Sequence, residues 1–250
     1  MDQLLIALDV ESAGKAVALA DSLRGAAGGF KVGSRLFTAE GPSMVRALVE
    51  RGDRVFLDLK FHDIPNTVAS AVSAATALGV WMVNVHASGG TRMMRAASDA
   101  SRETAARTGA PPALVIAVTV LTSMNAGTLA ETGVGAPILD QVLRLAELVH
   151  AAGLDGVVAS PQETTAIRRR FGSDFVIVTP GIRGAVAREH ASTTTETRAP
   201  GTDDQERTMT AGGAIAAGAS YIVVGRPVIA APSPREAAER IAEEISLSRS

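Results

Sequence analysis

The sequence predicts an α/β protein, a single-domain (β/α)8 TIM barrel, and three observations lead to this fold class. Eight short apolar runs recur along the chain. They are continuous more than alternating, as expected for parallel strands that are covered on both faces. Ala-rich segments with helical spacing separate them, and eight such units in 250 residues are typical of one closed barrel spanning residues 1–250.

The apolar runs and the helical segments follow one another in a regular order. The predicted strands are LLIALDV (4–10), GFKVGS (29–34), RVFLDLK (54–60), MVNVHA (82–87), ALVIAVTVL (113–121), GVVAS (156–160), FVIVTPG (175–181) and YIVVGRP (221–227). The clearest helical segments are 16–23, 44–51, 68–78, 138–151 and 235–245. Pro65 and Pro137 suit the first turn of a helix, and Gly79 and Gly153 stand just past helix ends, where glycine caps easily. A doubly wound open sheet is the alternative, but no G-x-G-x-x-G turn follows the first strand.

Composition excludes several classes of protein. The net charge of −2 gives no basic field for nucleic acid, and aromatic residues are only 3% of the chain, too few for base-stacking platforms. Cysteine is absent, which excludes disulfides and Cys-ligated metal sites. The first ten residues lack the basic region and cleavage site of a signal peptide, and no apolar run is long enough to span a bilayer. We therefore expect a soluble cytoplasmic protein without nucleic-acid or membrane partners.

Residues 184–204 interrupt the regular order of strands and helices. The segment GAVAREHASTTTETRAPGTDD is polar, Thr-rich and without periodicity. Loops of this length inside a compact domain are usually functional lids or disordered. We expect a long mobile loop here.

Charged residues gather where the predicted strands end, at the edge on which barrel active sites form. The polar residues at these ends are Asp9, Lys31, Asp58, Lys60, Asn84, His86, Thr122, Arg183 and Arg226. Asp58 and Lys60 are two positions apart and should point to the same side, with Leu57 and Leu59 facing the helices. With Lys31, and with Asp63 just beyond, charges of alternating sign would offset the cost of burial. A salt-bridge plug that closes the barrel is the alternative, although it needs fewer charges.

The last two strands indicate an anion site. Arg183 and Arg226 follow strands seven and eight, the usual phosphate site of such barrels, and Gly225 would let a ligand approach the backbone. The alternative is two solvated loop arginines. His62 and His86 are read as supporting residues, because no H-x-H or H-E-x-x-H spacing occurs. A divalent metal held by carboxylates stays open as an alternative at this point.

The motifs together resemble a known family. DLKFHDIPNT (58–67) is preceded by ALDV and FKVG and followed by VNVHASGG, VTVLTSM, TPGIR, DDQER and IVVGRP. In this order, from near residue 4 to near residue 230, they resemble orotidine 5′-phosphate decarboxylase. The D-x-K-x-x-D core is shared with a wider suprafamily, whereas the full decapeptide with TPGIR and GRPV is more specific.

The resemblance implies a homodimer of (β/α)8 barrels that converts orotidine 5′-phosphate to uridine 5′-phosphate and carbon dioxide without metal or organic cofactor. It implies Lys60 as proton donor, Asp58 beside the substrate carboxylate, and Asp9 and Lys31 at the ribose. The remaining implied contacts are Asp63, Ile64 and Thr67 to the neighbouring subunit's site, Thr122 to the pyrimidine, and Arg183, Gln205, Gly225 and Arg226 to the phosphate end.

Two other functions are weighed against this one. A magnesium-dependent aldolase or decarboxylase of sugar phosphates would use the same D-x-K-x-x-D carboxylates to hold a metal. A barrel that only binds a phosphate ligand would not need a lysine aimed between carboxylates. One departure is that the segment between Arg183 and Gln205 is longer than the family usually shows, so Gln205 is placed by the DDQER match alone.

Overall fold

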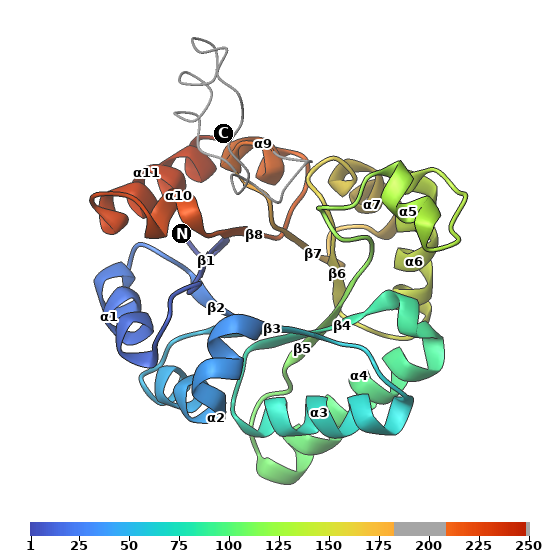
Figure 1. Ribbon diagram of the computed structural model, residues 1–250, viewed down its shortest axis with the longest axis horizontal. Helices are drawn as coiled ribbons and strands as arrows, with labels where there is room; N and C mark the ends of the chain where they lie inside the picture. Colours follow the sequence, from blue (N-terminus) through green and yellow to red (C-terminus); the bar gives the residue numbers. More distant parts are fainter. Residues whose placement is uncertain (183–208, 249–250) are drawn as a thin grey trace.

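The chain forms a closed barrel of eight parallel strands with helices packed around its outside (Figure 1). This computed structural model describes residues 1–182 and 209–248. The strands follow one another around the barrel in sequence order, and β1 closes it by pairing with β8. The predicted fold class is confirmed.

Each strand is short and is followed by at least one helix. In chain order the elements are β1 (Leu4–Ala7), α1 (Ala13–Leu23), β2 (Gly29–Gly33), α2 (Ser34–Glu50), β3 (Val55–Phe61), α3 (Pro65–Ala77), β4 (Met82–His86), the 3-10 turn η1 (Ala87–Gly89), α4 (Gly90–Thr108), β5 (Leu114–Val118), α5 (Ala126–Glu131), α6 (Ile138–Ala151), β6 (Gly156–Val158), α7 (Thr164–Phe171), β7 (Val176–Thr179), α9 (Ala211–Ala216), β8 (Tyr221–Val224), α10 (Arg226–Ile229) and α11 (Pro234–Leu247). All the predicted strands and helical segments correspond to observed elements.

The boundaries differ from the predicted ones in an informative way. β1 ends at Ala7 and β5 at Val118, three residues before the corresponding apolar runs end. The residues beyond the last strand pairing belong to the loops at the barrel mouth, so Asp9 and Thr122 are loop residues. Pro65 does occupy the first turn of α3, whereas Pro137 directly precedes α6.

The barrel wall separates two apolar layers, because successive strand residues face opposite sides. The inner cluster consists of Leu5, Ala7, Phe56, Met82, Ile116, Val118, Val158, Val178 and Val223. The outer cluster lies between strands and helices and includes Leu4, Ile6 and Leu57, with Leu59 packed against it. Alternation from Phe56 and Met82 therefore points Asp58 and Asn84 inward, above an apolar floor.

An aromatic and cationic cluster lies at the opposite end of the barrel. Trp81 and Tyr221, just before β4 and at the start of β8, meet edge to face with ring centroids 4.9 Å apart. The guanidinium of Arg54 lies 3.9 Å from the centre of the Trp81 ring. Such contacts favour burial of large rings. They therefore stabilise this end of the barrel, away from the mouth.

Two expectations from the sequence concern the loop at 184–204 and the lack of membrane-spanning segments. The loop expected at 184–204 lies outside the described residues. Within the part of the chain that the structure describes, no helix combines the length and apolar character needed to cross a bilayer.

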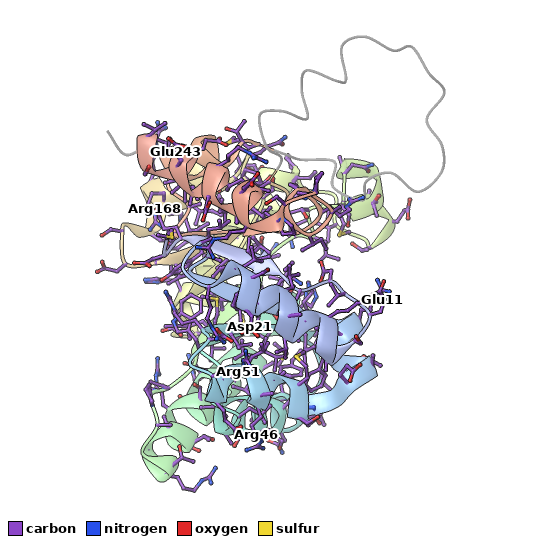
Figure 2. All side chains as sticks on the ribbon, turned by 90° about the vertical axis from the view of Figure 1, so that its left-hand side faces the viewer. Glu11, Asp21, Arg46, Arg51, Arg168 and Glu243 are labelled. Carbon is purple, nitrogen blue, oxygen red and sulfur yellow. The ribbon has the colours of Figure 1, made fainter. Side chains whose placement is uncertain are left out.

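Arg168 joins the end of α7 to the two following strands at the N-terminal end of the barrel, opposite Glu11 in the side view of Figure 2. Its guanidinium donates to the carbonyl oxygens of Gly218 at 2.8 and 3.0 Å and of Phe175 at 2.8 Å, and to Ser220 Oγ at 2.9 Å. It also donates to the carbonyl oxygen of Gly172. One side chain thus satisfies polar groups of two loops, the one between α7 and β7 and the one between α9 and β8.

We expect Arg168→Met to lower the free energy of unfolding by about 2 to 3 kcal/mol, because several carbonyl groups lose a charged donor. In a chain of this size that corresponds to a Tm about 5 to 10 °C lower, measured by calorimetry. The exposed neighbour Arg169→Met is the matched control and should leave Tm within about 1 °C. Equal effects of the two variants would contradict the role given to Arg168.

Candidate active site

Four charged side chains, one from the loop after β1 and three from β2 and β3, meet at the mouth of the barrel. Lys60 Nζ lies 2.7 Å from Asp58 Oδ1, and Lys31 Nζ lies 3.5 Å from Asp58 Oδ2. Lys31 Nζ also lies 3.3 Å from Asp9 Oδ1. The order Asp9, Lys31, Asp58, Lys60 alternates in sign, and we call these four residues the charged array. The sequence predicted such alternation for Lys31, Asp58 and Lys60 with Asp63, whereas the fourth member in the structure is Asp9.

Lys31 is the most enclosed cation of the array, with its side chain 10% exposed. Gly33, two residues further along β2, leaves the space that its ammonium occupies. A Cβ atom at Gly33 would lie 2.9 Å from Lys31 Nζ, closer than side chains normally come. Lys31 is therefore attracted by two carboxylates, and the lack of a side chain at Gly33 leaves room for its ammonium group between them.

Asp58 is the central anion of the array, with its side chain 13% exposed. Burial alone would raise its pKa, but the charges of Lys31 and Lys60 and hydrogen bonds from Lys60 and Asn84 outweigh it. The pKa of Asp58 therefore lies below its ordinary value. The group is a carboxylate at neutral pH, and the site holds two ammonium groups against it.

The backbone of β3 is irregular where it carries the array. Lys60 adopts a left-handed conformation, with φ of 53°. Asp58 and Lys60 do contact each other, as predicted, but on this irregular segment rather than on a regular strand. Asn84 of β4 touches both: its Oδ1 accepts a hydrogen bond from Lys60 N at 2.8 Å and its Nδ2 donates to Asp58 Oδ1 at 2.7 Å. The sequence marks Asn84 only as a polar strand end and assigns it no role.

Asp63, Ile64 and Thr67 stand apart from the array. All three are exposed, and Ile64 is 67% exposed, unusual for a large apolar side chain. Asp63 Oδ1 accepts a hydrogen bond from Ile64 N at 2.6 Å. These residues follow β3 at the mouth of the barrel, and their side chains are exposed to solvent.

The remaining predicted residues that the structure describes follow β5 and β8. Thr122 follows β5 and is buried, and Arg226 begins α10 after β8 and is exposed. Gly225 adjoins the array, since a Cβ atom there would lie 3.6 Å from Asp9 Oδ2. Arg183 and Gln205 lie outside the described residues.

Two histidines border the array without forming a metal site. The rings of His62 and His86 have centroids 5.4 Å apart. Among residues 1–182 and 209–248, no three His, Asp or Glu side chains are grouped as metal ligands would be. Both carboxylates of the array face lysines, so this donor set suits ammonium groups better than a divalent cation.

The pKa of His86 lies below the ordinary value of about 6.5, first because of burial and then because of the nearby His62 and Lys60. Since the folded pKa is lower than the unfolded one, His86 binds its proton more readily when unfolded. It should therefore lower stability as pH falls below about 6.5, and have no such effect above it.

We expect His86→Gln to lose less Tm than the wild type when the pH is lowered from 7.5 to 5.5. NMR titration of the imidazole signals, with His86 assigned by its absence in the variant, measures the pKa directly. A His86 signal that titrates above about 6.5 would contradict the expectation.

Comparison with known proteins assigns the chain to a family. The family model described as "Orotidine 5'-phosphate decarboxylase / HUMPS family" matches residues 2–241. Two relatives named orotidine 5′-phosphate decarboxylase, from Syntrophotalea carbinolica and Moorella thermoacetica, are each 51% identical to the chain. Each alignment covers 98% of this chain, with 95% and 93% of the respective relative.

Solved structures agree with the sequence relatives. The crystal structure of orotidine 5′-phosphate decarboxylase from Lactobacillus acidophilus has a TM-score of 0.81 and 34% identity, covering 97% of this chain and 98% of that one. The enzyme from Pyrococcus horikoshii has a TM-score of 0.73 and 28% identity, covering 97% of this chain and 99% of that one. The chain belongs to the orotidine 5′-phosphate decarboxylase / HUMPS family.

Proposed function

We infer that the charged array is the centre at which this chain, a carboxy-lyase of pyrimidine nucleotide synthesis, converts orotidine 5′-phosphate to uridine 5′-phosphate and carbon dioxide. One observation carries the assignment of the centre: Lys60 Nζ lies 2.7 Å from Asp58, which also contacts Lys31. An ammonium and a carboxylate are thus held side by side above an apolar floor. The ammonium can act on the carbon that gains negative charge, and the carboxylate can lie beside the departing carboxylate.

The reaction explains why both signs of charge are needed. Breaking the bond between C6 and the carboxylate carbon releases carbon dioxide and leaves the electron pair on C6, in the ring plane, without an adjacent electron sink. The ammonium of Lys60 stabilises this developing charge and then gives C6 a proton. Asp58, beside the departing carboxylate, favours its loss, and Lys31 keeps Asp58 ionised and in place.

The rest of the substrate is assigned to the surrounding loops. Asp9 and Lys31 bind the ribose, and Thr122 binds the pyrimidine. Arg183, Gln205, Gly225 and Arg226 bind the phosphate. Gly225 lies close to Asp9. This proximity supports an arrangement in which the ribose lies beside Asp9, after β1, and the phosphate beside Gly225, after β8. Contacts remote from C6 can lower the barrier when their binding energy organises the site.

The outward-facing residues after β3 support a homodimer. Asp63 and Thr67 are exposed beside Ile64, and contact with a partner subunit would remove the large apolar side chain of Ile64 from water. In the dimer, Asp63 reaches the ribose in the partner's site, with Ile64 and Thr67 near it.

The protein works in the cytoplasm, without nucleic acid or membrane.

The reaction is expected to need no metal. We expect the absorbance of orotidine 5′-phosphate to fall when purified protein is added in excess EDTA, as the orotate chromophore becomes uracil.

Lys60→Ala should reduce turnover at least ~1000-fold, because the proton donor is removed. The control Lys15→Ala, whose side chain is 66% exposed, should retain full activity. Turnover by Lys60→Ala near that of the wild type would remove Lys60 as the donor, and turnover only with added magnesium would favour a metal-dependent reaction.

Shared active sites are tested by mixing two inactive chains. We expect co-expressed Asp63→Ala and Lys60→Ala chains to recover activity in hybrid dimers, which contain one site with both residues intact. Random pairing gives about a quarter of the wild-type number of sites. Each variant expressed alone is the control. Absence of recovery in dimers shown to be hybrid would place Asp63 in its own subunit's site.

A further inference from the structure

The pairing of β3 with β4 skips residues beside the array. Leu57 pairs with Val83, and the next pair joins Phe61 to Val85. Three residues of β3 (58–60) therefore stand opposite the single residue Asn84. Such a bulge leaves backbone groups without ladder partners and redirects the side chains that it carries.

Lys60 is the most constrained residue of the bulge. Among the described residues it is the only one other than glycine with a positive φ, 53°. A side chain other than glycine rarely adopts this conformation unless surrounding contacts hold it. The backbone N–H of this residue donates a hydrogen bond to Asn84 Oδ1, 2.8 Å long.

Asn84 uses both ends of its amide on the array. It is fully buried, at 0% exposure, and while its Oδ1 accepts from Lys60 N, its Nδ2 donates to Asp58 Oδ1 at 2.7 Å. The orientation of the amide follows from these partners, because the reverse would place an acceptor against the carboxylate and a donor against an N–H. One rigid side chain therefore links the backbone of the donor lysine to the carboxylate beside it.

We propose that Asn84 is a positioning residue for decarboxylation, holding the Lys60 peptide and the Asp58 carboxylate in the one arrangement that presents ammonium and carboxylate together. This inference rests on the proposed function of the array. Asn84 is assigned no contact with the substrate and acts through its two neighbours. A shift of about 1 Å in such groups can cost about 100-fold in rate.

The test separates positioning from mere stability with two variants. Asn84→Leu removes both hydrogen bonds, and we expect kcat to fall about 100-fold. The dissociation constant for uridine 5′-phosphate should stay within about threefold, because the ribose and phosphate are assigned to residues other than Asp58 and Lys60. Ser101→Ala is the control, since it removes a buried hydrogen bond of 2.8 Å to the carbonyl oxygen of Ala113, far from the array. It should lower Tm without lowering kcat.

Asn84→Asp keeps the size of the side chain and adds a pH signature. As a carboxylate, the new group repels Asp58, so kcat is low at pH 8. When protonated, it can again accept from Lys60 N and donate to Asp58. The ratio of its kcat to that of the wild type should therefore rise at least about tenfold between pH 8 and pH 5.

The outcomes are distinct. A flat ratio for Asn84→Asp, or an Asn84→Leu variant with kcat within about threefold of the wild type, overturns the proposal while leaving the decarboxylase assignment intact. Absence of decarboxylation by the wild type would instead overturn the proposed function. If Asn84→Leu does not fold, Asn84→Asp decides, because its shape matches that of asparagine.

Discussion

The carboxylate of Asp58, buried between two ammonium groups, is the interaction on which the rest of the site depends. Taking an ion out of water costs several kcal/mol unless partners of opposite charge and hydrogen-bond donors replace the solvent. Lys31, Lys60 and Asn84 supply these partners. Because Lys31 and Lys60 both contact Asp58, removal of Asp58 would take this carboxylate from both ammonium groups at once, so the three residues depend on one another.

The barrel provides this unit with both its geometry and its surroundings. β1, β2 and β3 are adjacent in the closed sheet, so the array joins residues that lie 22 and 27 positions apart in the sequence, from Asp9 to Lys31 and from Lys31 to Asp58. Beneath the array, inward side chains such as Phe56 and Met82 exclude water. A lower local dielectric strengthens the ion pairs and the field that they exert at the mouth.

The sequence was sufficient to predict the fold and the grouping of Lys31, Asp58 and Lys60, although not the place of Asp63 outside the array, because both follow from repeating local patterns. Continuous apolar runs indicate parallel strands, and the carboxyl ends of such strands meet at one edge, which brings Asp58 near Lys31 without any knowledge of distances. The bulge could not be predicted in this way, since it is a property of how two strands pair rather than of either strand alone. Asn84 therefore looked like any polar strand end. Arg168 was missed for the same reason: its acceptors at Gly218 lie 50 residues further along the chain and are backbone atoms that carry no sequence signal.

The irregular backbone at Lys60 indicates how the chain reconciles stability with reactivity. A regular strand would complete its ladder with β4 and place Asp58 and Lys60 on the same face, about 6 to 7 Å apart along the wall. The bulge gives up ladder hydrogen bonds and accepts a left-handed lysine, and these local losses persist only where surrounding structure over-determines them. Here the surrounding structure is the fully buried amide of Asn84 and the outer apolar layer packed against Leu57 and Leu59. The functional irregularity is thus confined to three residues, while the remainder of the barrel keeps its regular pairing and supports them.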